Sequence, residues 1–262
     1  MKRPKKSLGQ NFLVDPNIIR KIINSVEIFD KNILEIGPGR GALTDEILNK
    51  NPKSLMLIEK DKLISKELEI KYKKNKIIEL YNSDILKFDI EKKIKKETII
   101  FGNLPYNISS QILTKIIKFQ KWPPKYHAVI FMFQKEMARR IAGRFNTSDY
   151  GRLSILRNFR LNIFDKFNVS ANCFWPKPKV DSTVICFKPI KKTSHNIRNI
   201  ESLEKVTNIL FSNKRKMINK NIKKIFKKNE NIKLLKGLDL KKRPTEIELN
   251  RYYDIAELYD KS

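Results

Sequence analysis

The chain has 262 residues, of which 40% are hydrophobic, so it can bury the core of one large domain or of a core domain with a small appendage. Its 56 Lys and Arg residues outnumber its 28 Asp and Glu residues, and the resulting formal charge of +28 favours a polyanionic partner, nucleic acid before an anionic membrane surface. No apolar run approaches the roughly 20 residues of a membrane-spanning helix, and the basic N-terminus lacks the apolar stretch of a secretory signal.

Short apolar segments alternate with amphipathic ones over the first two thirds of the chain. Helical patterns begin with residues 15–26, where Asp15 is the expected N-cap and Pro16 the first helical residue. Two late segments, 164–170 and 182–190, are expected to add antiparallel strands at the edge of the sheet. The alternation predicts a doubly wound α/β sheet. Five segments are apolar on both faces, as buried parallel strands are: 32–36, 54–59, 76–82, 97–101 and 127–133.

The composition changes near residue 191. Residues 191–243 hold 17 Lys or Arg against four Asp or Glu, and apolar residues such as Ile218, Ile222 and Ile225 recur at helical spacing. This pattern is typical of a small basic helical domain. We therefore expect a first domain at 1–190 and a basic helical domain at 191–262, whose charge favours a nucleic-acid partner.

The few soft-metal ligands are widely spaced. Cys173 and Cys186 lie 13 positions apart, which fits neither a zinc site nor a disulfide framework. His127 and His195, the only histidines, have no metal-ligand partner at useful spacing. We expect two thiols in a reducing compartment and no metal.

Glycines and polar side chains follow four of the predicted strands. The glycine-rich sequence GPGRG begins at Gly37, between strand and helix, where the backbone can approach a ligand closely. Glu59 ends the second strand, Asp84 follows the third and Asn103 the fourth. Because the carboxyl ends of parallel strands meet at one edge of a sheet, we expect one binding site there.

The chemistry of these residues suits a nucleoside ligand. A carboxylate at Glu59 can accept hydrogen bonds from ribose hydroxyls, and one at Asp84 can accept them from an adenine amine. Pro105 ends the fourth strand and leaves Tyr106 on a loop close to Asn103. The third glycine of a dinucleotide-binding fingerprint would stand at Ala42, so a dehydrogenase is disfavoured. The glycines together with the sequence NLPY resemble the Rossmann-like S-adenosylmethionine-dependent methyltransferases.

A more specific resemblance spans about residues 3–258. Seven segments, in the same order along the chain, resemble the ribosomal RNA small-subunit adenine dimethyltransferase family of the KsgA/RsmA type: LGQNFL, EIGPGRGALT, GNLPYNIS, QKEMARRI, YGRLS, FWPKPKVDS and FSNKRKMINKN. The resemblance implies a Rossmann-like class I methyltransferase sheet with a small C-terminal all-α domain, and S-adenosyl-L-methionine as cofactor. It also implies N6,N6-dimethylation of two adjacent adenosines near the 3′ end of small-subunit rRNA.

The resemblance also implies residue roles. Cofactor binding is expected of Asn11, Leu13, Gly37, Gly39, Glu59, Asp84 and Asn103. The catalytic set is expected to be Asn103, Leu104, Pro105, Tyr106 and Phe174. In this set the Asn103 side-chain oxygen and the Leu104 carbonyl accept the two N6 hydrogens. Tyr106 stacks on the extruded adenine and Phe174 helps to form the wall on its other face.

Basic residues are expected to contact rRNA phosphates, which orient the substrate. They are Lys5, Lys6, Arg139, Arg140, Arg144, Lys214, Arg215, Lys216 and Lys220, the last four on a helix expected over 213–224. The implied partner is small-subunit rRNA or the immature small subunit. We expect a monomer without a metal or a membrane contact, acting in the bacterial cytoplasm, with an organelle as the alternative.

Two other functions stay open. The first is the erythromycin-resistance type of large-subunit rRNA adenine methyltransferase, which usually has NIPY in place of NLPY. The second is a non-catalytic nucleic-acid-binding factor on the same fold, which would not need to keep NLPY, Glu59 and Asp84 together. A role as a checkpoint in ribosome assembly is compatible with the expected activity.

Overall fold

The computed structural model describes residues 10–226, 232–235 and 237–261. The chain divides into two compact units. The first, which we call the sheet unit, comprises Met1–Ile116, Pro123–Ala138 and Asn162–Pro189. The second, the helical unit, comprises Ile117–Trp122, Arg139–Leu161 and Ile190–Ser262. The last segment of the helical unit begins at Ile190, and the unit also takes in two earlier segments of the chain.

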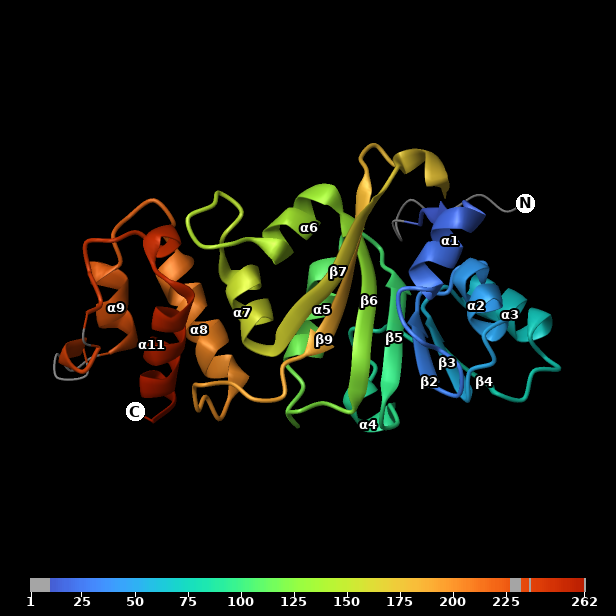
Figure 1. Cartoon of the computed structure of the whole chain (residues 1–262), viewed down its shortest axis with the longest axis horizontal. Coiled ribbons are helices and arrows are strands. Elements are labelled where there is room, and N and C mark those ends of the chain that lie inside the picture. The colour runs from blue at the N-terminus through green and yellow to red at the C-terminus, as the bar shows by residue number, and fades with distance from the viewer. Residues whose placement is uncertain (1–9, 227–231, 236, 262) are drawn as a thin grey trace. The chain divides into compact units, whose positions relative to one another are not determined.

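A seven-stranded sheet forms the centre of the sheet unit (Figure 1). In spatial order the strands are β4 (Ile78–Asn82), β3 (Ser54–Glu59), β2 (Asn32–Ile36), β5 (Thr98–Asn103), β6 (Tyr126–Gln134), β9 (Ser182–Pro189) and β7 (Leu161–Val169). The first five run parallel to one another, and β9 runs antiparallel to β6. The two late strands expected at the edge, β9 and β7, lie together at the β6 end of the sheet, with β7 outermost.

The first helix illustrates how local sequence sets an element boundary. Asp15 Oδ1 accepts hydrogen bonds from the backbone N–H groups of Asn17 and Ile18, at 2.8 and 3.1 Å, and Pro16 is the first residue of α1. Both features are as predicted. The helices up to residue 160 are α1 (Pro16–Ile23), α2 (Ala42–Leu48), α3 (Lys62–Lys71), α4 (Ile90–Lys93), α5 (Ser109–Ile117), α6 (Lys135–Ala142) and α7 (Arg152–Arg160).

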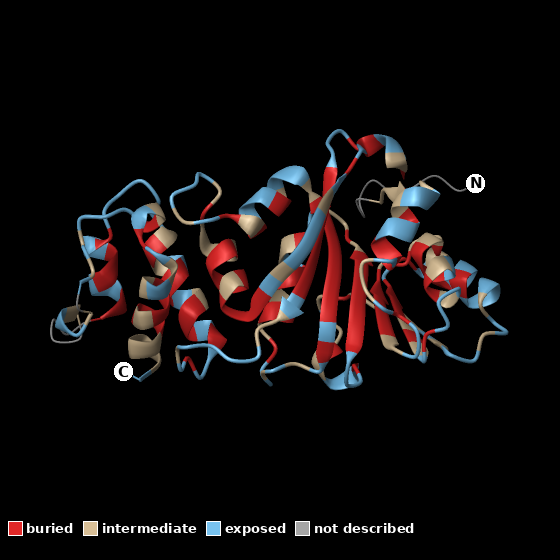
Figure 2. Ribbon diagram, in the orientation of Figure 1, coloured by how far each residue is buried: buried red, intermediate tan, exposed pale blue. Residues whose placement is uncertain are grey.

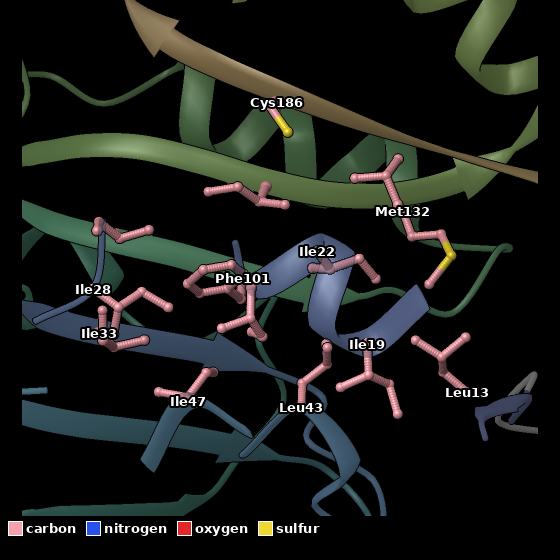
Figure 3. Close-up of a cluster of buried hydrophobic side chains, with 14 of the residues drawn as sticks. Leu13, Ile19, Ile22, Ile28, Ile33, Leu43, Ile47, Phe101, Met132 and Cys186 are labelled. Carbon is pink, nitrogen blue, oxygen red and sulfur yellow. The ribbon is translucent and has the colours of Figure 1, made fainter. Parts of the chain in front are cut away.

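A hydrophobic core of the sheet unit lies where α1 and α2 pack on one face of the sheet. Figure 3 shows Ile22 of α1 and Leu43 of α2 gathered with Ile33 and Phe101 of the strands. Figure 2 shows the inner strands as almost continuously buried, in line with their apolar sequences. Burial of this face fixes the register of the parallel strands, and therefore the positions of the loops at their carboxyl ends.

The helical unit is built around α8 (Ile200–Phe211), α9 (Asn219–Ile225) and α11 (Leu249–Lys261) together with α7. Tyr252 is fully buried and stacks on Phe211 with ring centres 5.8 Å apart. The helix expected over 213–224 is wrong in its first half, because helical structure resumes only at Asn219. Residues 212–217 are all exposed, so a helix there would gain no stability from packing. No helix among the described residues is both long and apolar enough to cross a membrane.

Candidate active site

A cavity of about 410 Å³ opens at the carboxyl ends of the parallel strands in the sheet unit. This volume is in the range of small-molecule sites in proteins. Its lining combines the segment before α1, the glycine loop after β2, the ends of β3 and β5, and Trp175 of the short strand β8 (Phe174–Trp175). Among the lining residues are Asn11, Phe12, Leu13, Gly37, Gly39, Arg40, Glu59, Lys60, Asn103, Leu104, Pro105, Tyr106 and Trp175.

The glycine loop presents bare backbone to this cavity. Gly37 and Gly39 have φ angles of +68° and +55°, which side-chain-bearing residues adopt at a cost. A Cβ atom on Gly39 would lie 3.0 Å from a ring carbon of Phe12, so the Phe12 ring would have to shift to accommodate one. The predicted close approach of backbone to ligand is therefore available at these two positions.

Glu59 is positioned by two backbone groups. Its carboxylate accepts hydrogen bonds from the N–H groups of Gly39, at 3.3 Å, and of Asp61, at 2.7 Å. Burial raises the pKa of Glu59, and these two hydrogen bonds partly offset the shift. Each carboxylate oxygen can accept more than one hydrogen bond, so Glu59 retains capacity for hydroxyl donors such as those of a ribose.

Asp84 lies beside the cavity without lining it. Its neighbours Ser83 and Ile85 are lining residues, whereas the Asp84 carboxylate pairs with Lys60 Nζ at 2.8 Å and accepts a hydrogen bond from the Leu86 N–H at 2.9 Å. These interactions, the Lys60 contact foremost, lower the pKa of Asp84. Lys60 itself is a lining residue, so the wall of the cavity beside Asp84 is formed by Lys60, Ser83 and Ile85.

The last residue of β5 and the segment that follows it supply polar groups to the lining of the cavity. Asn103 Nδ2 donates a hydrogen bond to the backbone oxygen of Asn11 at 3.2 Å. The Tyr106 hydroxyl and Ser182 Oγ are hydrogen-bonded at 2.8 Å, and burial raises the pKa of Tyr106. Asn103, Leu104, Pro105 and Tyr106 all line the cavity, so the structure brings these four predicted residues together.

A two-stranded ribbon that includes the N-terminal strand lines one side of the cavity. Strand β1 (Phe12–Leu13) pairs antiparallel with β8 (Phe174–Trp175), with Phe12 opposite Trp175 and Leu13 opposite Phe174. Successive strand residues face opposite sides, so Leu13 and Phe174 share one face and are buried in the core, while Phe12 and Trp175 share the other and line the cavity. Leu13 also contributes to the lining of the cavity. The predicted wall residue Phe174 is therefore buried and is not among the lining residues, whereas its neighbour Trp175 lines the cavity and is 42% exposed.

One acidic residue of the cavity was not selected from sequence. Glu35 of β2 is 1% exposed, accepts a hydrogen bond from Thr44 Oγ1 at 2.7 Å, and has its pKa raised to about 8 by burial. Its signal was present in the sequence as a single carboxylate within the apolar strand NILEI. A carboxylic acid at this depth holds a proton that a surface carboxylate would release.

The predicted RNA-contacting residues that the structure describes all belong to the helical unit and are exposed: Arg139, Arg140, Arg144, Lys214, Arg215, Lys216 and Lys220. Lys214 Nζ also donates to the backbone oxygen of Ser148 at 3.2 Å, which ties one cation to the loop before α7. Lys5 and Lys6 lie outside the described residues. Within the described residues no three His, Cys, Asp or Glu side chains are grouped to hold a metal ion.

Comparisons with known proteins identify the family. The model of the ribosomal RNA adenine dimethylase family matches residues 1–261. The chain is 40% identical to the ribosomal RNA small subunit methyltransferase A of Pelagibacter ubique over 98% of this chain and 97% of that protein. It is 43% identical to the protein of the same name from Malacoplasma penetrans over 86% of this chain and 80% of the relative.

Solved structures agree with this assignment. A dimethyladenosine transferase from Plasmodium falciparum superposes with a TM-score of 0.76 at 27% identity, covering 93% of this chain and 95% of that one. The 23S rRNA methyltransferase ErmE shares the fold, with a TM-score of 0.68 at 23% identity over 95% of this chain and 99% of that one. The predicted class I methyltransferase sheet with a C-terminal helical part is confirmed. The chain therefore belongs to the ribosomal RNA adenine dimethylase family and is an S-adenosyl-L-methionine-dependent methyltransferase.

Proposed function

We propose that the cavity binds S-adenosyl-L-methionine and that the chain dimethylates N6 of two adjacent adenosines near the 3′ end of small-subunit rRNA in the immature small subunit. One observation carries the proposal most strongly. The glycine loop and Glu59, which suit a nucleoside, and Asn103 to Tyr106, which suit an exocyclic amine and its base, line one cavity. The relatives named small subunit methyltransferase A support the same substrate.

The residues present fit this cofactor. Glu59 offers acceptors for the ribose hydroxyls, and the backbone at Gly37 and Gly39 can lie against the ligand without side-chain interference. Asn11 and Leu13 cover the site from the N-terminal strand. The Asp84 carboxylate reaches an adenine amine only if it shares its oxygens with Lys60 or releases that cation. When bound, the cofactor supplies a methyl group on a sulfonium, which is already a strong electrophile.

The remaining chemical difficulty lies in the target amine. The N6 lone pair of adenine is delocalised into the ring, so the enzyme must position the amine and accept its hydrogens. The hydrogen bond from Asn103 Nδ2 to Asn11 fixes the amide so that Oδ1 remains to accept one N6 hydrogen. The Leu104 carbonyl accepts the other. These two acceptors turn the nitrogen lone pair toward the methyl group.

The target base must leave its stack to reach these acceptors. Tyr106 lines the cavity and its hydroxyl is anchored to Ser182, so the ring is held ready to stack on the extruded adenine. No general base is required, since the proton of the methylated amine can pass to water. After the first methyl group is added, a single N6 hydrogen remains, and one acceptor suffices for the second transfer.

We also propose a division of labour between the units. The sheet unit carries the chemistry, while the exposed cations of the helical unit bind rRNA phosphates. The chain acts as a monomer in the cytoplasm and uses no metal ion, because methyl transfer from a sulfonium needs no Lewis acid. Sedimentation of the pure protein tests the monomer, and activity after chelation tests the independence from metal.

The deciding experiment is a methyl-transfer assay with labelled S-adenosyl-L-methionine. Unmethylated small subunits and large subunits are compared in parallel, and the modified bases are mapped. We expect dimethyladenosines at the 3′ end of the small-subunit rRNA. Label confined to large subunits would assign the chain to the resistance type. RNA binding without any label would indicate a non-catalytic factor.

A further inference from the structure

The N-terminal strand is joined to the rest of the sheet unit by little regular structure. Strand β1 and its partner β8 have two residues each, and one further backbone bond, from Val14 N to Cys173 O at 2.9 Å, extends the pairing. Ribbons this short are not stable on backbone hydrogen bonds alone. One face of the ribbon is anchored by Leu13 and Phe174 in the core. The other face of the ribbon, formed by Phe12 and Trp175, therefore needs a stabilising side-chain contact of its own.

Arg40 occupies that other face. Its guanidinium carbon lies 4.8 Å from the ring centre of Phe12 and 5.1 Å from that of Trp175, both within the range of cation–π attraction. Phe12 and Trp175 are register partners in the ribbon, so one guanidinium contacts both strands. Arg40 itself comes from the glycine loop. A single side chain thus joins three segments that surround the cavity.

Two further contacts show that the N-terminal strand covers the cavity. Phe12 packs directly on the glycine loop, since a Cβ atom on Gly39 would meet its ring at 3.0 Å. The backbone oxygen of Asn11 receives the hydrogen bond from Asn103. A ligand enclosed by the glycine loop and Asn103 is therefore beneath residues 11–13, and it can leave more easily when this strand moves away.

We propose that Arg40, Phe12 and Trp175, which we call the Arg40 clasp, hold the N-terminal strand closed over the bound methyl donor. Arg40 is then a positioning residue that sets how long the donor and its demethylated product stay bound. The inference rests on the proposed function, because it takes S-adenosyl-L-methionine as the occupant of the cavity. Since each adenosine receives two methyl groups, spent donor must be exchanged between transfers, and the clasp governs that exchange.

The test uses the full-length chain with Trp122→Phe, which leaves Trp175 as the single remaining tryptophan of the two in the sequence. The probes are S-adenosyl-L-methionine and S-adenosylhomocysteine. Calorimetry gives their affinities, and stopped-flow Trp175 emission gives the dissociation rates. The variants are Arg40→Ala, Arg40→Lys and Trp175→Leu, the last by calorimetry only, together with the double variant of Arg40→Ala and Trp175→Leu. Arg20→Ala is the control, since it removes the same charge from an exposed site on α1.

We expect Arg40→Ala to weaken binding of both probes about tenfold, which corresponds to about 1.4 kcal/mol, mainly through faster dissociation. The KM for the donor rises in proportion while kcat at saturating donor is retained. Arg40→Lys keeps the charge and gives an intermediate loss. The double variant loses less than the sum of the two single losses, because the Arg40–Trp175 contact is removed by either change, whereas the Arg40–Phe12 contact is lost only with Arg40.

Two results would overturn the inference. One is an Arg40→Ala affinity equal to that of Arg20→Ala in chains with the same melting temperature. The other is strict additivity of the Arg40 and Trp175 changes. A parent chain that binds neither probe would contradict the proposed function itself and remove the occupant on which the clasp depends. These outcomes can be told apart, because only the last one concerns the parent chain without a change at Arg40 or Trp175.

Discussion

The Nδ2 atom of Asn103 lies 3.2 Å from the backbone oxygen of Asn11, and the hydrogen bond between them joins the end of β5 to the N-terminal strand. The bond determines which end of the amide remains available. With Nδ2 committed to a carbonyl, Oδ1 is the acceptor for an incoming amine. The residue proposed to cover the cofactor and the residue proposed to orient the target amine are thereby linked.

Replacing Asn103 by Ala removes the amine acceptor. We expect kcat to fall on the order of 100-fold, while rRNA affinity changes less than about threefold, because the base is no longer positioned although the phosphates are still bound. Methyl transfer to small subunits and filter binding of the same RNA measure the two effects. Asn208→Ala, an exposed amide on α8, is the control. Parallel losses of turnover and binding would sink the proposed role of Asn103.

Tyr106 offers two separable contributions, its ring and its hydroxyl. Tyr106→Phe retains the ring and loses the 2.8 Å bond to Ser182, so we expect a loss in kcat/KM of only about threefold, equal to that of Ser182→Ala. Tyr106→Ala also loses the stacking surface, and kcat/KM should fall about 10- to 100-fold. Single-turnover methyl transfer with each variant measures the difference. Equal losses for Phe and Ala would place the whole effect on the hydroxyl.

Glu59→Gln tests the ribose contact. Glutamine keeps the shape of the side chain, but it removes the charge, and its amide nitrogen cannot accept hydrogen bonds from Gly39, Asp61 or a hydroxyl. We expect the dissociation constant for the cofactor to rise about tenfold or more, because hydrogen bonds to a charged group are the stronger ones. Calorimetry provides the measurement, with Glu69→Gln on the exposed face of α3 as control. Unchanged affinity in Glu59→Gln would exclude the carboxylate from the site.

Glu35 makes the stability of the sheet unit depend on pH. Burial raises its pKa to about 8 from an ordinary value of 4.5. Below the ordinary value both folded and unfolded chains hold the proton. As pH rises from there toward 8, the unfolded chain releases it first, so the free energy of unfolding falls across this window. Glu35→Gln should lack this fall, whose slope is at most about 1.4 kcal/mol per pH unit.

Denaturant unfolding without cofactor at pH 5 and pH 7.5, followed by Trp175 emission in the Trp122→Phe chain, compares the two proteins. The Glu69→Gln chain should keep the pH dependence of the parent. Parallel pH profiles for the parent and Glu35→Gln would show that the Glu35 carboxyl titrates normally.

The cations of the helical unit should act through salt-dependent binding. Changing Arg215, Lys216 and Lys220 to Gln removes three exposed charges, and for each phosphate that is no longer neutralised the slope of log affinity against log salt should fall by roughly 1. The measurement is rRNA affinity at several salt concentrations. Gln replacements at Lys66, Lys73 and Lys74, in and just after α3, remove the same charge as control. An unchanged slope in the helical-unit variant would show that Arg215, Lys216 and Lys220 are solvated surface residues that do not contact rRNA phosphates.

The sequence predicted those features that are governed by local pattern. The five parallel strands, the Asp15 cap and the cavity residues Gly37, Glu59 and Asn103 follow from apolar runs, capping chemistry and the common edge of a parallel sheet. The Pro105 signal also placed Tyr106 on a loop close to Asn103. The family resemblance added Asn11 and Leu13, whose position at the cavity depends on contacts between distant segments.

Other features were set by partners that a linear pattern does not show. Phe174 and Trp175 are adjacent aromatics, and only the pairing of β8 with β1 decides which one is buried. Asp84 was expected at the cavity, but its carboxylate forms an ion pair with Lys60, which follows the neighbouring strand β3. The position of β9 between β6 and β7 likewise depends on long-range pairing.

The insertion of β9 also sets an order in time. The glycine loop, Glu59 and Asn103 are synthesised within the first 103 residues. Strand β8, which pairs with the N-terminal strand, and Ser182, which anchors Tyr106, belong to residues 174–189. A growing chain can therefore form the floor of the site long before its wall exists, and β6 keeps an open hydrogen-bonding edge until β9 emerges. The active site is thus among the last parts of the sheet unit to become complete during translation.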